Sequence, residues 1–538
     1  MSLWGSSKNG EPREAEDDSH PRPTSSSREE RDSTEEPTER TRLIAQRRPP
    51  PAGGYLDPDD PAVSPYNLWS VRAVRFFEVF FLMITFLWWV VLFISIFVSP
   101  PGMHSRGSGF FDVSYTTLTV GNIIIALLFF AVPSTPMGVL SFIISILLIV
   151  NMIIILVAPR IRLEEGWPGI ASVVWAAIIG LYNILANRTV RWGKAEEEAR
   201  LTGREEQRRT LKEWLAVLLA TIFMVIFALI AVLLTATVSL RARDATLPAP
   251  GHRYLVDGDK YQVHVACVGN QTYDKKGNAN PTVLLEGGYM PVEDSFEDWV
   301  YEAYQNGTIE RYCYWDRPGL GWSDNAPSPH SASMSADALS EALAIAGEEG
   351  PWVLVSAGIG GIYSRVFSAR HPRAIAGIML IDALHEDLLY QIGNPGTGFL
   401  LWARGFISPL GLDRLPGALF KGRSREDRVY GKSSYQGGKF IKNKLQENLV
   451  ADGLTKNEVL SARNIQQPEV PLTVVSSGVH INKDKDWKRR QEDLTKITDN
   501  LVEWRIVKKA PAEEVWRTEE GRYELGDALK KLMKAKSK

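Results

Sequence analysis

The sequence predicts a fold in two parts, a membrane region of five α-helical spans followed by an α/β domain. Five apolar runs between about residues 79 and 239 are each close to the ~20 residues that cross a bilayer as a helix. After about residue 250, short β-branched runs alternate with stretches that have helical periodicity. Alternation of this kind is typical of a mostly parallel sheet with helices on both faces.

Composition narrows the possible functions. The chain has 538 residues, enough for several domains, and a formal net charge of −2. Its 61 Lys and Arg against 63 Asp and Glu give no electrostatic indication of a nucleic-acid partner. Two cysteines are too few for a disulfide-built scaffold or a zinc cluster, although they could form one bridge. We expect no metal and no cofactor.

Residues 1–70 are predicted to be a disordered cytosolic tail. The segment is polar and rich in Ser, Pro, Glu, Asp and Arg, so it has too little apolar surface to offset the entropy lost on ordering. It has no apolar signal-peptide core and is too acidic for a mitochondrial transit peptide. Within it, Glu39–Ile44 (ERTRLI) fits an acidic dileucine pattern that directs sorting towards vacuoles or lysosomes. The alternative is that this pattern is not a sorting signal and is an ordinary part of the solvated tail.

The transmembrane region is predicted over residues 71–240. A soluble core rarely needs five consecutive apolar runs of this length, so the lipid bilayer is the expected environment. The polar side chains inside the runs, Asn122, Asn151 and Asn183, form no row of carboxylates that would indicate a proton path. A transporter with a regulatory domain is therefore only the third hypothesis. The runs are 79–98, 112–132, 137–158, 169–187 and 214–239.

Flanking charges predict the orientation of the spans. Arg72 and Arg75 precede the first span, and the loop between the fourth and fifth spans holds many more Lys and Arg than the first and third loops. The positive-inside rule then places the N-terminus in the cytosol and everything after residue 240 on the lumenal side. If one run were a re-entrant segment rather than a span, the part of the chain after residue 240 would lie on the cytosolic side.

The C-terminal domain is predicted from a Pro-containing linker near residue 248 onwards. Helices fit between the later strands, for example over 334–347 and 361–370. The predicted strands are 253–257, 260–268, 281–286, 310–315, 352–356, 376–381, 471–476 and 502–507.

Three motifs in this domain carry a family resemblance. LLEGG (284–288) follows the third strand, YWDRPGLGWSD (314–324) follows the fourth, and GIYSRVF (361–367) begins a helix after the fifth. Their order resembles the α/β-hydrolase fold over about residues 250–538. The resemblance implies a helical cap at about 387–468, whose aromatics Phe399, Trp402 and Phe406 would line a pocket, meet the membrane or pack in the cap. The whole chain is similar to a group of fungal multi-span proteins of poorly defined function, some described as mitochondrial integral membrane proteins.

The resemblance also locates the catalytic positions, and two of them are empty. The hydrolase elbow G-x-S-x-G aligns with Ser356–Gly360, so Gly358 stands where the nucleophile would be. The catalytic His should follow the last strand, but no His follows His480, and Ala512 marks the degenerate position. A serine without a base is a weak nucleophile at neutral pH.

Other residues could retain part of the chemistry. Asp382 ends the sixth strand, a position the fold uses for its acid, and could equally cap a turn. Ser356 is a displaced nucleophile candidate, and His385 a displaced base. Backbone N–H groups of Gly288 and Ile359 would form an oxyanion-like pair, whereas Glu286 would bring a carboxylate close to it.

Further features favour a lumenal domain. The strands that carry Cys267 and Cys313 are neighbours in the resembled fold, which makes a disulfide plausible, and a disulfide requires an oxidising compartment. Two glycosylation sequons begin at Asn270 and Asn306. These features favour a vacuolar or other secretory-route membrane, with a mitochondrial membrane as the alternative.

Three functions follow from these observations. The favoured one is a membrane-anchored pseudo-hydrolase whose pocket binds a lipid or protein ligand under the cap. The second is an active serine hydrolase of the esterase or lipase type with displaced catalytic residues. The third is the transporter.

Overall fold

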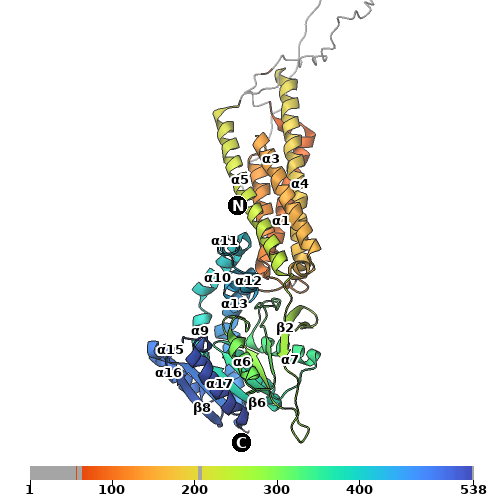
Figure 1. Ribbon diagram of the computed structural model, residues 1–538. Helices are drawn as coiled ribbons and strands as arrows, with labels where there is room; N and C mark the ends of the chain where they lie inside the picture. The colour runs from red at the N-terminus through yellow and green to blue at the C-terminus, as the bar shows by residue number, and fades with distance from the viewer. Residues whose placement is uncertain (1–55, 57–62, 104, 204–208, 536–538) are drawn as a thin grey trace, which may run out of the picture. The chain divides into compact units, whose positions relative to one another are not determined.

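A computed structural model describes residues 56, 63–103, 105–203 and 209–535. Most of the predicted tail, including the dileucine pattern at 39–44, lies outside these residues. The remainder contains the two predicted parts, a bundle of long helices and an α/β domain (Figure 1).

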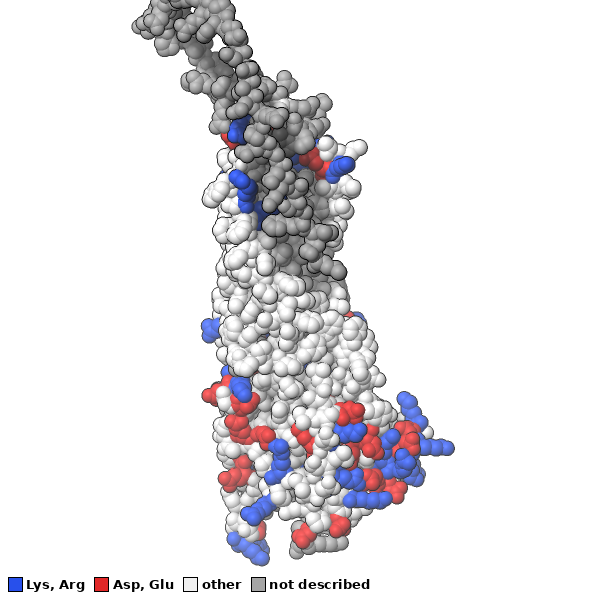
Figure 2. All heavy atoms as spheres, turned by 180° about the vertical axis from the view of Figure 1, so that it is seen from behind, with Lys and Arg blue, Asp and Glu red and all other residues white. Residues whose placement is uncertain are grey.

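Five helices of the described chain are long and apolar enough to cross a membrane, which confirms the predicted spans. Contacts join α3 to both α4 and α5, and α2 to both α1 and α4. Viewed from behind, their surface is a band almost free of charged side chains, whereas charges crowd the α/β domain (Figure 2). The helices are α1 (Trp69–Ser95), α2 (Phe110–Leu128), α3 (Thr135–Val157), α4 (Pro159–Thr202) and α5 (Leu211–Asp244).

Local sequence explains where these helices begin and bend. The Ser134 hydroxyl accepts a hydrogen bond from the Met137 N–H at the start of α3. Thr210 and Glu213 form a capping box at the start of α5. Inside α4, Gly166 leaves helical geometry with a φ of +62°, two residues before Pro168. The starts of α3 and α5 and the bend in α4 are therefore encoded by residues that satisfy or interrupt the helical hydrogen bonds.

The α/β domain contains one eight-stranded sheet in the order β1-β2-β4-β3-β5-β6-β7-β8. Strand β2 runs antiparallel to β1 and β4, and the strands from β4 to β8 are parallel. This order confirms the predicted α/β-hydrolase fold. The strands are β1 (His252–Val256), β2 (Tyr261–Val268), β3 (Thr282–Glu286), β4 (Tyr312–Trp315), β5 (Trp352–Ala357), β6 (Ile375–Ile381), β7 (Leu472–Ser477) and β8 (Leu501–Val507).

Helices cover both faces of the sheet. On one face, α6 (Phe296–Gln305) and α17 (Glu519–Lys534) bury Trp299 and Leu529. On the other, α7 (Ala332–Ala346), α8 (Gly360–Arg370) and α14 (Lys456–Ile465) bury Leu339, Ile362 and Val459. The central strands are apolar throughout, as expected for strands buried on both sides.

A helical cap separates β6 from β7, as the resemblance implies. It contains α9 (Leu389–Ile392), α10 (Pro395–Ile407), α11 (Arg414–Phe420), α12 (Arg425–Val429), α13 (Gly438–Val450) and α14. The Trp402 ring meets the Phe93 ring of α1 with centroids 5.9 Å apart, and Phe406 packs in the same cluster. Trp402 and Phe406 therefore pack against the membrane helices, an outcome outside the three predicted alternatives, whereas Phe399 is exposed.

Candidate functional site: the corner at Gly358

The turn after β5 has the geometry of a nucleophile elbow. Gly358 has a φ of +50°, in the left-handed region that favours glycine. Its N–H donates to the Ile381 carbonyl at 3.1 Å, and its own carbonyl accepts from the Leu384 N–H at 2.8 Å. These bonds fix the tip between the ends of β5 and β6, where an attacking side chain would project. Gly358 supplies no such side chain.

Glu513 faces this empty position. A Cβ built on Gly358 would lie 3.6 Å from Glu513 Oε2 and 3.8 Å from the Gly288 Cα. The family resemblance predicts the degenerate histidine position at Ala512, whereas the side chain that faces the elbow is that of Glu513. Burial, together with the nearby charge of Asp382, raises the pKa of Glu513. Within the described part of the chain, no hydrogen bond reaches its carboxylate.

Asp382 sits at the end of β6 and is fully buried. Its Oδ1 accepts hydrogen bonds from the Ser477 N–H at 3.1 Å and from Trp487 Nε1 at 2.9 Å. Its Oδ2 lies 2.8 Å from His480 Nδ1 and 2.8 Å from the Glu513 nitrogen, which donates to it. Four donors therefore converge on one carboxylate and tie the end of β6 to the segments after β7 and β8.

His480 is the site residue that sequence reasoning missed. It lies in α15 (Gly478–Lys483), just after β7, rather than after β8 where the fold keeps its base. Its ring stacks on Trp487 with centroids 3.8 Å apart. A signal was available, because the carboxyl ends of adjacent parallel strands meet, and Asp382 and His480 follow neighbouring strands.

The displaced candidates lie elsewhere. Ser356 is completely buried, and its hydroxyl is 2.8 Å from that of Ser364 in α8. His385 Nε2 is 3.0 Å from an oxygen of Asp493, and its Nδ1 accepts a hydrogen bond from the Asp387 N–H. The structure therefore brings neither residue into hydrogen-bond contact with Gly358 or Asp382.

The oxyanion-like pair lies beside the elbow. Gly288 is next to Gly358, as the built Cβ shows, and Ile359 is the first residue after it. The Glu286 side chain points elsewhere, since it accepts hydrogen bonds from Arg317 at 2.5 Å and from Trp315 Nε1 at 2.6 Å. The expected conflict between this carboxylate and an oxyanion is therefore removed by a buried ion pair.

A cavity of about 200 Å³ opens at this corner. The Tyr289 ring packs edge-on against Phe440 of the cap with centroids 5.4 Å apart, and Lys444 Nζ lies 4.4 Å from the Tyr289 ring centroid. The walls of the cavity combine apolar and acidic residues: Gly288, Tyr289, Met290, Pro291, Asp294, Phe296, Ala512, Glu513, Glu514 and Trp516. Arg517 pairs with both Asp294 and Glu514, which leaves Glu513 as the unpaired acid among these residues.

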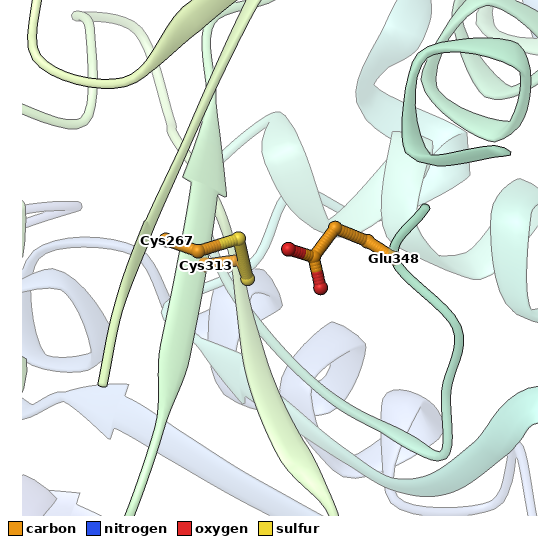
Figure 3. Close-up of side chains that lie close together, drawn as sticks. All are labelled: Cys267, Cys313 and Glu348. Atoms are coloured by element: carbon orange, nitrogen blue, oxygen red, sulfur yellow. A yellow bond between two sulfur atoms is a disulfide. The ribbon is translucent and has the colours of Figure 1, made fainter. Parts of the chain in front are cut away.

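Cys267 and Cys313, which are register partners on β2 and β4, form a disulfide. Glu348 lies beside it (Figure 3). Its carboxylate accepts a hydrogen bond from Arg311 at 2.7 Å. The three side chains are close enough to suggest a metal site. However, disulfide sulfurs are not the thiolates that bind metals. The cluster therefore fits a structural bridge.

A second compact group consists of His264, Glu293 and Asp316, with ligand atoms within 4.8 Å of one another. His264 Nδ1 is 3.0 Å from Asp316 Oδ2, which also accepts from the Trp322 N–H at 2.9 Å. Burial and the neighbouring Asp316 raise the pKa of Glu293 well above its usual range. The raised pKa favours an uncharged, protonated Glu293 beside the Asp316 carboxylate.

Sequence comparisons find relatives of this chain in two yeasts. Residues 39–267 match the description "Region of unknown function (DUF2417)". An uncharacterised Schizosaccharomyces pombe protein is 32% identical over 507 residues, 88% of this chain and 92% of that protein. An uncharacterised vacuolar membrane protein of Saccharomyces cerevisiae is 28% identical over 386 residues, 61% of this chain and 59% of that protein.

Solved structures with some similarity include an α/β hydrolase enzyme from a deep-sea metagenome library, at 14% identity and a TM-score of 0.35. It aligns with 48% of this chain and 88% of its own. A putative ancestral haloalkane dehalogenase, at 13% identity and a TM-score of 0.37, aligns with 53% of this chain and all of its own. The order of the eight strands identifies the fold. The DUF2417 match covers the membrane helices and reaches into the second strand of the sheet. At 32% identity over 88% of its length, the chain belongs to the same family as the S. pombe protein.

Proposed function

We propose that this membrane protein uses its α/β-hydrolase fold to bind a ligand and does not hydrolyse it through a serine. The observation that carries this proposal is the pair of residues at the elbow, Gly358 and Glu513. The first has no attacking atom, and the second presents a carboxylate within 3.6 Å of the place where that atom would be attached. Ser356 does not replace the nucleophile, because it is buried against Ser364.

The remaining polar groups support binding. Asp382 is saturated by four donors, a role that holds the corner together. Glu513, by contrast, is mostly buried and unpaired among the described residues. A carboxyl group accepts hydrogen bonds when ionised and donates one when protonated. A ligand with an amine or hydroxyl group and an apolar body fits the cavity, since its other walls include Tyr289, Phe296 and Trp516.

We propose a vacuolar or other secretory-route membrane, with the α/β domain in the lumen. The flanking charges of the spans, the disulfide and the exposed positions of Asn270 and Asn306 support this side. The vacuolar description of the S. cerevisiae relative is compatible with it. A mitochondrial membrane is the alternative.

Fluorophosphonate labelling of the purified full chain tests the absence of a serine nucleophile. We expect no labelling of the natural protein, because no activated serine hydroxyl stands at the corner. Stoichiometric labelling that disappears in Ser356→Ala would overturn the proposal and favour a displaced serine hydrolase.

A gain-of-function series makes the test sharper. Gly358→Ser combined with Glu513→His restores a nucleophile and an imidazole where the geometry places them, so we expect slow labelling of this double variant. Gly258→Ser is the matched control, because Gly258 also has a positive φ, +63°, but lies in an open turn with no atom near its built Cβ. Labelling of the double variant alone would show that the pocket is intact and that only the reacting groups were lost.

A further inference from the structure

A separate cavity lies where the membrane helices meet the cap. Three spans contribute to its wall near one end: the start of α2 (Ser108 and Phe111), the start of α4 (Arg160 and Glu164) and the end of α5 (Arg241 and Asp244). The cap contributes α11, α12 and the first turn of α13, and the turn after β4 adds Gly319 and Gly321. The cavity is therefore built by both parts of the chain.

Positive charge dominates its lining. Five cationic side chains face two carboxylates: Arg160, Arg241, Arg414, Arg428 and Lys439 against Glu164 and Asp244. A third carboxylate, Glu165, pairs with Arg241 from outside the lining at 2.6 Å. The five cationic side chains therefore outnumber these three carboxylates by two.

Several donors in this cavity are not used by the protein. The Lys439 ammonium donates to the Gly321 carbonyl at 2.7 Å, and no carboxylate in the described chain pairs with it directly. Ser434 is only 6% exposed, and its hydroxyl has no hydrogen-bond partner among the described residues. The buried Nε of Arg414 has none either, whereas that of Arg160 lies 3.7 Å from the Glu164 carboxylate. Unsatisfied buried donors are uncommon in proteins, so their convergence on one cavity indicates an acceptor.

The backbone adds a further donor surface. Helix α13 begins at Gly438, and no side chain caps its N-terminus. Gly437, Gly438, Lys439 and Phe440 all line the cavity. The first amides of a helix have no intrahelical partner and carry the positive end of its dipole, which attracts anions. Arginine and lysine donors beside such an end suit a phosphate group.

We propose that this cavity binds a phosphate-bearing anion, held by Lys439, Ser434 and the first turn of α13. The phosphate group can belong to the headgroup of an anionic phospholipid or to free phosphate, since both offer the same oxygens. The lipid source is favoured by position, because the ends of spanning helices lie at the depth of lipid headgroups. Burial lowers the pKa of Lys439 to about 8, so the ammonium form that an anion needs is still present at neutral pH.

Thermal unfolding of the full chain in neutral detergent tests the site. One arm adds inorganic phosphate against chloride at constant ionic strength, and the other adds phosphatidic acid against phosphatidylcholine. Stabilisation by inorganic phosphate indicates a free-phosphate site, and stabilisation by phosphatidic acid alone indicates a headgroup site. In either case Lys439→Gln should weaken the apparent affinity at least tenfold.

Two further variants distinguish a lost site from a damaged fold. Ser434→Ala removes only a hydroxyl group and should weaken the same ligand by a smaller factor. Lys432→Gln is the control, because Lys432 lies in the same segment of the cap but is exposed to solvent. The proposal is wrong if neither probe stabilises the natural chain, or if Lys439→Gln and Ser434→Ala respond as the natural chain does.

Discussion

At Gly358 the backbone has a φ of +50°, a conformation in which any residue with a side chain is strained by about 1–3 kcal/mol. A new Cβ would fit there in ordinary van der Waals contact, since the nearest side-chain atom, Glu513 Oε2, would be 3.6 Å away. The turn therefore has room for a nucleophilic side chain, which Gly358 lacks. Glu513, also at positive φ (+59°), places a carboxylate oxygen 3.6 Å from that built Cβ. The side chains at these two positions are the basis of the proposal that the corner binds a ligand rather than attacking it.

Lys442 in α13 gives a prediction at the same scale. Its ammonium is buried and donates to the Ile96 carbonyl at the end of α1, and burial lowers its pKa to about 7. In the unfolded chain its pKa would be ~10.4. Between these two values the unfolded state binds more protons than the folded state, so stability should increase as the pH rises from 7. Below pH 7 both states are charged, and this contribution is constant.

Lys442→Met should remove this dependence. The natural chain should gain up to about 1.4 kcal/mol of stability per pH unit above pH 7 relative to the variant, as measured by chemical unfolding between pH 6 and 9. Lys421→Met, at an exposed position of the cap, is the control and should leave the slope unchanged. Parallel curves for Lys442→Met and the natural chain would contradict the prediction.

At the scale of elements, the cap is tied to the bundle by charge as well as by aromatic packing. Asp244 ends α5 and is buried. Its carboxylate accepts hydrogen bonds from Arg414 at 2.5 Å and from two nitrogens of Arg428, at 2.6 and 3.0 Å. A paired, bidentate geometry of this kind fixes orientation as well as distance. The end of one span therefore holds two helices of the cap.

Asp244→Asn should destabilise the chain by about 3 kcal/mol, because it leaves the buried Arg428 and the half-buried Arg414 without their shared counter-charge. Thermal unfolding in detergent measures this loss. Asp413→Asn, an exposed carboxylate at the start of α11, should change stability by less than about 0.5 kcal/mol. Equal melting of the two variants would mean that the ion pairs contribute nothing net.

At the scale of the whole molecule, the membrane topology of the spans determines which compartment the α/β domain and its corner at Gly358 face. If the α/β domain is lumenal, Asn270 and Asn306 meet the glycosylation machinery, and both are exposed. We expect two glycans on the chain expressed in yeast. Endoglycosidase treatment should shift its gel mobility, and Asn270→Gln and Asn306→Gln should each remove one step. An unglycosylated chain that fractionates with mitochondria would contradict the proposed side and compartment.

The sequence by itself determined the elements. The five spans were predicted in number and order and the eight strands to within two residues of their ends, because apolar length and residue periodicity are local properties that do not depend on the partner surface. The helices α1 and α4 extend ten or more residues beyond the apolar runs 79–98 and 169–187, since both begin before the apolar stretch. The sequence also shows that position 358 has no nucleophilic side chain, since this position lies within a contiguous motif of five residues. The helical cap followed from the resemblance.

Only the tertiary structure decided which side chains meet. Glu513 rather than Ala512 faces the elbow because its backbone, at positive φ, donates to Asp382 and turns the side chain towards Gly358. The His480–Asp382 contact joins residues 98 apart in the chain. The basic cavity assembles ends of three spans with the cap, whose charges are separated by hundreds of residues. Periodicity reports burial along one element, but contacts between elements depend on packing directions that no local pattern encodes.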